Sequence, residues 1–211
     1  MQDSFVRVCS NPVIQIKLTE LRDKKTKFGR FCELTREIST FLIYEALANI
    51  PLKTGRVLTP TGEFAKAFYP AQKIALVPIM RAGMPPADAG RMLLSDVSIH
   101  HLGLRRNEKT LKPESYYENA PAPGKIPDHC IVVESMLATG GSGSYAIDRI
   151  KAWGVSQITF VGILAAPEGI KKVRTNHPTV PIFVAAIDRC LNDKGYILPG
   201  LGDAGDRQFG T

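Results

Sequence analysis

Apolar residues follow two spacings along the chain, one typical of helices and one typical of buried strands. Residues 11–25 and 27–49 have helix spacing, and the second stretch has a broad apolar face that includes Phe31, Leu34, Ile38, Phe41, Leu42 and Tyr44. Beyond Pro51, short continuous apolar runs predict strands at residues 74–80, 98–104, 130–134, 157–164 and 181–187. Helical stretches at 85–95, 143–153 and 168–176 separate some of them. This alternation predicts an α/β fold with a parallel sheet covered by helices on both faces.

Three further segments depart from that alternation. Residues 53–69 contain strand-like pieces at 56–58 and 64–68 around a Thr-Pro-Thr-Gly turn, which predicts a hairpin. Residues 107–123 are polar and interrupted by prolines, which predicts a mobile loop of the kind that covers active sites. The tail at 195–211 is so rich in glycine that we expect a shaped loop and no helix. Its Gly200-x-Gly202-x-x-Gly205 lacks the strand-then-helix context of a dinucleotide-binding fingerprint.

Composition narrows the class of protein. A length of 211 residues, with 44% hydrophobic and 22% charged residues, fits one globular domain. We find no membrane-spanning run and no signal-peptide pattern, and we expect a cytoplasmic protein. The net charge of +7 favours an anionic partner, but the basic residues are dispersed, which argues against nucleic acid.

Cysteine and histidine do not indicate a reactive centre. The cysteines Cys9, Cys32, Cys130 and Cys190 are too scattered for a metal site or a predicted disulfide, so we expect reduced thiols. The histidines, His100, His101, His129 and His177, lack a serine or cysteine partner at catalytic spacing, and we assign them no catalytic role.

The segment 131–154 carries the clearest candidate chemistry. Three β-branched residues, Ile131 to Val133, lead into Glu134, a Thr/Gly/Ser-rich loop and then a helical pattern. Such a loop presents unpaired backbone N–H groups at the positive end of a helix dipole, an arrangement that binds phosphate. The alternative is an ordinary Gly/Ser turn between a strand and a helix.

Two arginines favour the phosphate interpretation. Arg81 follows the predicted strand 74–80 in an Arg-Ala-Gly turn, and Arg106 follows the predicted strand 98–104. Carboxyl ends of parallel strands meet at one edge of a sheet, where ligands bind. A guanidinium also matches a pair of phosphate oxygens. Singly, each arginine is equally consistent with a surface ion pair.

These motifs resemble those of the uracil phosphoribosyltransferases, which are type I phosphoribosyltransferases. The shared features are Met136-Leu137-Ala138-Thr139-Gly140-Gly141-Ser142, the Arg-Ala-Gly turn and the tail Gly-Leu-Gly-Asp-Ala-Gly-Asp. The resemblance covers residues 11 to the end, including Ala165 to Gly169 and Ala186-Ile187-Asp188. It implies a parallel-sheet type I phosphoribosyltransferase fold with flanking helices, N-terminal helices and a small β-arm or hood formed with the C-terminal tail. One domain would then comprise a helical extension at 11–49, a β-arm at 53–70, a core at 71–190 and a uracil-binding hood at 191–211.

The resemblance also implies a reaction and its residues. The activity would be transfer of the phosphoribosyl group of phosphoribosyl diphosphate (PRPP) to uracil, giving UMP and diphosphate in pyrimidine salvage. Catalytic roles would fall to Arg81, Arg106, Glu134 and Asp203. PRPP would be bound by Arg81, Arg106, Glu134, Ser135, Met136, Leu137, Ala138, Thr139, Gly140, Gly141, Ser142 and Asp203. Uracil would be bound by Ile197, Gly202, Asp203 and Ala204. In the lid segment, Thr110-Leu111, Pro113 and Tyr116-Tyr117 match the family.

Cofactor and partners are implied in the same way. Mg²⁺ would arrive on PRPP without direct protein ligands, in contact with Glu134 through water, and GTP is a candidate effector. Members of the family are homodimers or homotetramers. The chain differs from the usual family sequence at Glu134-Ser135, where Asp-Pro is common, and at Pro85-Pro86. Two alternatives therefore stay open: a catalytically weak or silent paralogue, and a nucleotide-sensing, RNA-binding regulator on the same fold.

Overall fold

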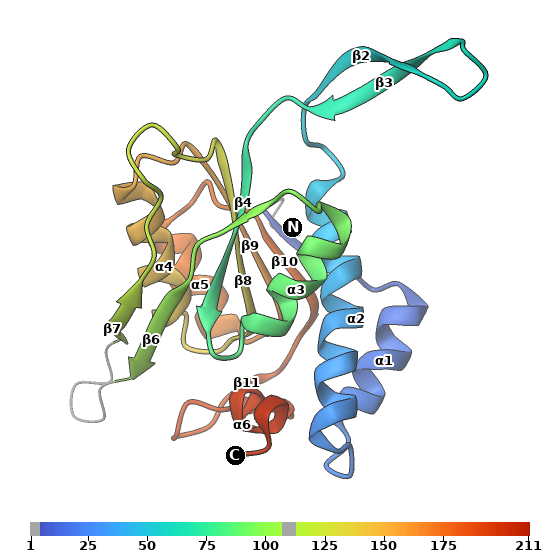
Figure 1. Cartoon of the computed structure of the whole chain (residues 1–211). Helices are drawn as coiled ribbons and strands as arrows, with labels where there is room; N and C mark the ends of the chain where they lie inside the picture. The colour runs from blue at the N-terminus through green and yellow to red at the C-terminus, as the bar shows by residue number, and fades with distance from the viewer. Residues whose placement is uncertain (1–4, 107–112) are drawn as a thin grey trace.

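The computed structural model describes residues 5–106 and 113–211 and has helices on both sides of a central sheet (Figure 1). The helices are α1 (Pro12–Arg22), α2 (Phe28–Leu47), α3 (Met84–Leu93), α4 (Gly141–Ala152), α5 (Pro167–Asn176) and α6 (Ala204–Phe209). The strands of the central sheet are β1 (Val6–Val8), β4 (Ile74–Met80), β5 (Ser98–Ile99), β6 (Leu102–Arg106), β7 (Pro113–Glu118), β8 (His129–Leu137), β9 (Gln157–Ala165) and β10 (Ile182–Ile187). The predicted α/β fold is confirmed.

The sheet runs in the order β1-β10-β9-β8-β4-β6-β7, with β5 also beside β4. All neighbours are parallel except β6 and β7, which pair antiparallel. From β4 the chain continues to β6 on one side, whereas from β8 it continues to β9 on the other. The carboxyl ends of β4 and β8 therefore flank a point where the strand order reverses, which is where open α/β sheets bind ligands.

Alternate residues of the central strands divide the core into two layers. Leu76 and Val133 pack with α1, α2 and α3, whereas Val77 and Val132 pack with α4. A parallel strand buried on both faces has apolar residues at consecutive positions, so the runs in the sequence were sufficient to predict these strands. Within the described ranges, no helix is long and apolar enough to span a membrane.

Several sequence-based boundaries were wrong. The strand predicted at 130–134 continues to Leu137, because it pairs with β9 as far as Ala165, so Glu134 lies inside the strand. The strand predicted at 98–104 is two strands, β5 and β6. The tail, expected to be a loop throughout, contains the short helix α6 and a strand pair, β11 (Cys190–Leu191) with β12 (Ile197–Leu198).

The segment predicted as a mobile loop is also partly ordered. Residues 113–118 form β7, which pairs with β6. The carboxylate of Glu118 at its end accepts bonds from Arg149 Nε and NH2, each 2.9 Å, and from Trp153 Nε1 at 2.7 Å, which fastens β7 to α4. Arg149 also holds the pKa of Glu118 below its usual range. Thr110-Leu111 lie outside the described residues.

The predicted hairpin is β2 (Leu52–Leu58) with β3 (Phe64–Pro70). It extends from the body at the end opposite to the C-terminus (Figure 1), so it does not form a hood with the C-terminal tail. Instead, α6 of the tail packs on α2. Among the described residues, the cover over the carboxyl ends of the strands is therefore built from the C-terminal tail, without the hairpin.

Candidate active site

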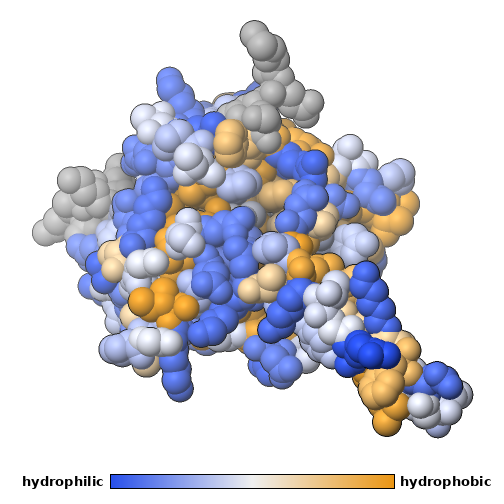
Figure 2. All heavy atoms as spheres, turned by 90° about the horizontal axis from the view of Figure 1, so that it is seen from above, coloured by the Kyte–Doolittle hydropathy of each residue, from blue (hydrophilic) through white to orange (hydrophobic). Residues whose placement is uncertain are grey.

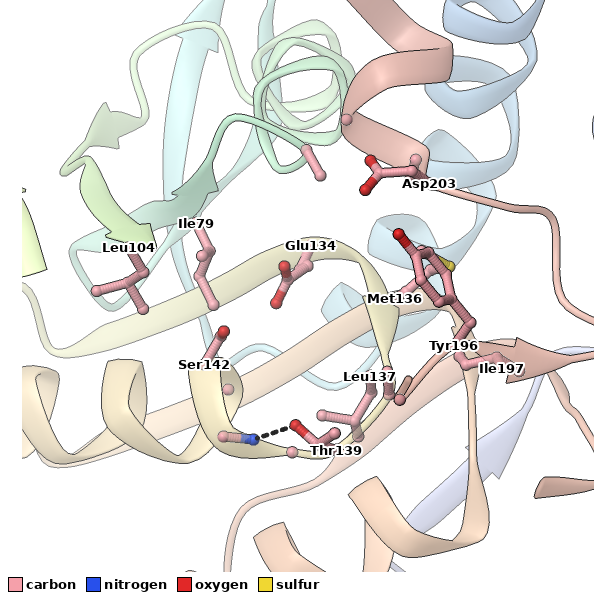
Figure 3. A pocket seen from close by; sticks show the side chains of 18 of the residues that line it. Ile79, Leu104, Glu134, Met136, Leu137, Thr139, Ser142, Tyr196, Ile197 and Asp203 are labelled. Carbon is pink, nitrogen blue, oxygen red and sulfur yellow. Dashed lines mark hydrogen bonds between the residues drawn. The ribbon is translucent and has the colours of Figure 1, made fainter. Parts of the chain in front are cut away.

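A pocket of about 530 Å³ opens at the carboxyl ends of β4 and β8. Its walls come from five parts of the chain: the end of β4 with its Arg81 turn, Leu104 in β6, the end of β8 with the loop into α4, the loop at 194–197 and the turn at 203–205. In Figure 3 the carboxyl of Glu134 points into this space between Ser142 on one side and Asp203 on the other. Most residues expected to contact substrate are thus brought together in one place.

The loop from β8 into α4 has the geometry expected of a phosphate-binding turn. Gly140 is the N-cap of α4 with φ of 74°, and Thr139 Oγ1 accepts a hydrogen bond from the Gly141 N–H at 3.4 Å (Figure 3). The first N–H groups of a helix have no acceptor in a preceding turn, and they face an anion with the positive end of the dipole. The loop thus lies between a strand and a helix N-terminus, as the sequence predicted, and it lines the pocket.

Glycine is required at Gly140 for two reasons. Its positive φ disfavours residues with a Cβ, and an added Cβ would lie 2.7 Å from the Gly169 carbonyl oxygen. A Cβ at Gly169 would in turn lie 2.5 Å from the Ala138 carbonyl oxygen. The start of α5 is thus packed directly against the loop. This contact gives a physical reason for glycine at both Gly140 and Gly169, which each belong to a segment that resembles the family.

Glu134 is the titratable group most affected by the pocket. Burial raises its pKa to about 8, because the charged carboxylate loses hydration. At neutral pH the free protein holds this side chain mostly as the neutral acid.

Arg81 lines the pocket from the turn after β4. Its NH2 lies 3.0 Å from Asp206 Oδ1, its guanidinium carbon lies 5.8 Å from the centre of the Phe209 ring, and both charged side chains are about half exposed. A Cβ on the neighbouring Gly83 would lie 2.4 Å from the Val133 carbonyl oxygen, so the turn passes close against β8. The second predicted arginine, Arg106, ends β6, but its side chain lies outside the described part of the structure.

The tail is held over the pocket by a partly buried ion pair. The Arg22 guanidinium donates to both carboxylate oxygens of Asp188, at 2.7 and 2.6 Å, and NH1 also donates to the Gly200 carbonyl oxygen at 2.7 Å. The Gly200 N–H donates to Asp188 Oδ2 at 2.9 Å. Helix α1, the end of β10 and the tail therefore meet at one carboxylate.

Among the predicted uracil contacts, Ile197, Asp203 and Ala204 line the pocket, whereas Gly202 lies just outside its lining. Ser135 also does not line it: this side chain is 1% exposed and points into the protein. The other predicted PRPP contacts, Met136 to Ser142, all line the pocket.

Sequence reasoning missed the residues that face the site from the tail and the hydrophobic wall. Among them are Ile79, Leu104, Lys194, Gly195 and Tyr196, which line the pocket, and Asp206, which pairs with Arg81. Asp203 caps α6 by accepting from the Asp206 N–H at 3.0 Å. An acidic N-cap followed three residues later by a second acid is a helix-start signal that could have revealed α6 and, with it, Asp206.

Comparisons with known proteins agree with this geometry. The family described as uracil phosphoribosyltransferase matches residues 8–211. Proteins named uracil phosphoribosyltransferase from Roseiflexus sp. (strain RS-1) and Dictyoglomus thermophilum are each 48% identical; the alignments cover 98% of this chain and 98% and 100% of theirs.

Solved structures agree with this chain in fold. The AQ2163 protein from Aquifex aeolicus superposes with a TM-score of 0.90 at 35% identity and 97% coverage of both chains. A hypoxanthine-guanine phosphoribosyltransferase from Bacillus anthracis, 16% identical with a TM-score of 0.51 over 76% of this chain and 80% of its own, shares the fold alone. With a family match over nearly its whole length, the chain belongs to the uracil phosphoribosyltransferase family.

Proposed function

We propose that the protein transfers the phosphoribosyl group of PRPP to uracil in the pocket between β4 and β8, giving UMP and diphosphate. The observation that carries this proposal is the convergence of a phosphate-binding turn, a half-exposed arginine and a glycine-rich tail on one pocket. In pyrimidine salvage this reaction recovers free uracil as a nucleotide.

Each wall of the pocket has one task in this proposal. The loop at 138–142 holds the 5′-phosphate with backbone N–H groups, and Glu134 accepts from the ribose hydroxyls. Arg81 and Arg106 stabilise charge on the diphosphate. The tail around Ile197 and 202–204 pairs with the alternating carbonyl and N–H groups of uracil through its backbone.

In the reaction, N1 of uracil forms a bond to C1 of the ribose as the bond from C1 to the diphosphate oxygen breaks. The diphosphate leaves with the electron pair of the broken bond, and the proton of N1 passes to water. The carbon passes through an oxocarbenium-like state, so the side chains position the reactants and stabilise charge. No side chain is needed as a nucleophile.

The residues present fit a magnesium ion carried by the substrate. Glu134 and Asp203 supply carboxylate oxygens to the pocket, and the described residues contain no cluster of three or more His, Cys, Asp or Glu side chains placed to hold a metal. Mg²⁺ is commonly held by one or two carboxylates together with substrate phosphates and water. When bound, the ion would neutralise charge on the diphosphate.

The test is an assay of diphosphate release from PRPP and Mg²⁺ with uracil, cytosine, hypoxanthine and orotate. We expect release with uracil only. If no base gives diphosphate release, the protein is a catalytically silent paralogue. Nucleotide-dependent RNA binding without turnover would favour the regulator. The same assay with and without GTP tests the proposed effector.

Arg81→Ala should raise the KM for PRPP by about 10-fold to 100-fold, because a charge-assisted contact to the diphosphate is lost. The KM for uracil should change much less. Steady-state kinetics with each substrate varied in turn will measure both values, with Arg7→Ala as the control for loss of an exposed arginine on β1, at the far edge of the sheet. An unchanged KM for PRPP would contradict the role assigned to Arg81.

The ionisation of Glu134 predicts a pH dependence. With its pKa raised to about 8 by burial, the carboxylate fraction grows as pH rises through that value. We expect kcat/KM for PRPP to increase by about tenfold between pH 7 and pH 9, as a base that must be ionised requires. Glu134→Gln should abolish this rise, and Glu134→Asp should retain a carboxylate titration. An equal rise in Glu134→Gln would assign the titration to another group.

We also propose that the protein is a homodimer or homotetramer, as the family resemblance implies, in which two chains associate through their β2–β3 hairpins. The hairpin exposes Leu52, Val57, Leu58, Phe64, Phe68 and Tyr69, and Figure 2 shows apolar side chains on this projection at the lower right. A two-stranded ribbon is marginally stable alone in water, and an exposed apolar surface favours association. Light scattering should give a dimer or tetramer mass that falls to the monomer mass in Phe64→Glu/Phe68→Glu; a monomeric unmodified protein would contradict the proposal.

We place the protein in the cytoplasm, where free thiols such as its four cysteines remain reduced.

A further inference from the structure

A buried series of hydrogen bonds links three of the walls of the pocket behind its surface. Gln208 Nε2 in α6 donates to Ser135 Oγ at 2.8 Å, and Ser135 Oγ donates to the Ala82 carbonyl oxygen at 2.9 Å. Gln208 and Ser135 are 3% and 1% exposed. Water therefore has little access to this series, and replacing one partner would strand a polar group of the other.

Each member of the series adjoins a residue of the pocket. Ala82 follows Arg81 in the turn after β4, Ser135 follows Glu134 in β8, and Gln208 belongs to the helix whose N-cap is Asp203. The diphosphate turn, the ribose-binding strand and the tail are thus joined through side chains that do not line the cavity. Their relative positions set the distance between the two substrates.

The other contacts of α6 differ in kind. Arg207 NH1 donates to the Leu21 and Leu201 carbonyl oxygens at 3.1 and 2.8 Å, which ties α6 to α1 and to the tail itself. Asp206 contacts Arg81 at the half-exposed surface. When Arg81 binds diphosphate, its ion pair with Asp206 has to break, whereas the buried hydrogen bond between Gln208 and Ser135 can remain. Gln208 is therefore the contact of α6 that can hold the tail to β8 throughout turnover.

We propose that Gln208 and Ser135 are positioning residues, which hold the uracil-binding tail in register with the diphosphate turn. This inference rests on the proposed function. The Oε1 atom of Gln208 has no hydrogen-bond partner among the described residues, so its amide is held to Ser135 through Nε2.

The test compares Ser135→Ala, Gln208→Met and the double variant by steady-state kinetics and thermal unfolding. Gln208→Met and Ser135→Ala should each raise the KM for uracil by about tenfold with kcat within about twofold, the size expected for loss of one buried hydrogen bond. The double variant should unfold at a higher temperature than Ser135→Ala, because no amide is left unsatisfied, yet it should keep the raised KM. Ser135→Thr, which retains the hydroxyl, should have a KM for uracil close to that of the unmodified protein.

Gln15→Met is the matched control. Gln15 Nε2 in α1 donates to the Ala185 carbonyl oxygen in β10 at 3.1 Å, away from the pocket, so this variant should leave the KM for uracil unchanged. If the variants at 135 and 208 lower only the unfolding temperature and keep the KM of the unmodified protein, these hydrogen bonds have only a structural role and the inference is wrong. Failure of the proposed function is distinguishable, because the unmodified protein would then show no turnover.

Discussion

Replacing Gly140 by alanine should lower kcat/KM for PRPP by about a hundredfold or more, the cost expected when a phosphate-binding loop is displaced by about 1 Å. The positive φ of this residue disfavours alanine, and the new methyl group would lie 2.7 Å from the Gly169 carbonyl oxygen. Either the loop or the start of α5 has to move. The strain should also lower the free energy of unfolding by about 1–3 kcal/mol.

Gly62→Ala is the control for this experiment. Gly62 has a φ of 83°, similar to that of Gly140, but a Cβ there would meet nothing within 4 Å. Because Gly62 lies in the hairpin turn between β2 and β3, its replacement should lower stability without changing KM or kcat. Equal losses of activity in both variants would show that general destabilisation, and not displacement of the phosphate loop, causes the effect.

Replacing Asp188 by alanine should lower the free energy of unfolding by about 3–5 kcal/mol, the cost of removing one partner of a buried ion pair. Asp188 is 8% exposed and receives donors from both Arg22 and Gly200. The variant leaves a largely buried guanidinium without its carboxylate and frees the tail from the end of β10. The KM for uracil should therefore rise as well.

Denaturant unfolding and uracil kinetics will measure the two effects of Asp188→Ala. Glu33→Ala is the control, since Glu33 pairs with Arg30 at 3.3 Å on an exposed face of α2, where such pairs contribute about 0–1 kcal/mol. A change in Asp188→Ala no larger than in Glu33→Ala would mean that the pair does not hold the tail.

The central strands and the loop from β8 into α4 were predictable because their signals are local. The prediction of 74–80 matches β4, since a strand buried on both faces is apolar at every position. The turn at Gly140 was predictable because glycine is the residue that tolerates both its φ and its close contacts. Arg81 was found as a polar residue immediately after such a strand.

Elements that depend on distant partners were not predictable in the same way. Glu134 and Ser135 belong to β8 because β9 supplies hydrogen-bond partners, although the two residues themselves resemble the start of a loop. Helix α6 forms in a glycine-rich segment because Asp203 caps it and Arg207 binds carbonyl oxygens of residues near the end of α1. β7 exists because β6 pairs with it.

The α/β class, the order of the main strands and the motifs that assign the family can be read from the sequence alone, because periodicity and glycine requirements act over a few residues. Which groups face one another depends on the packed structure: Arg81 with Asp206, Asp188 with Arg22, and Ser135 with Gln208 and Ala82. These pairs are separated by up to 166 residues, and a hydrogen bond depends on a fixed distance and direction between its atoms, which only the packed chain provides.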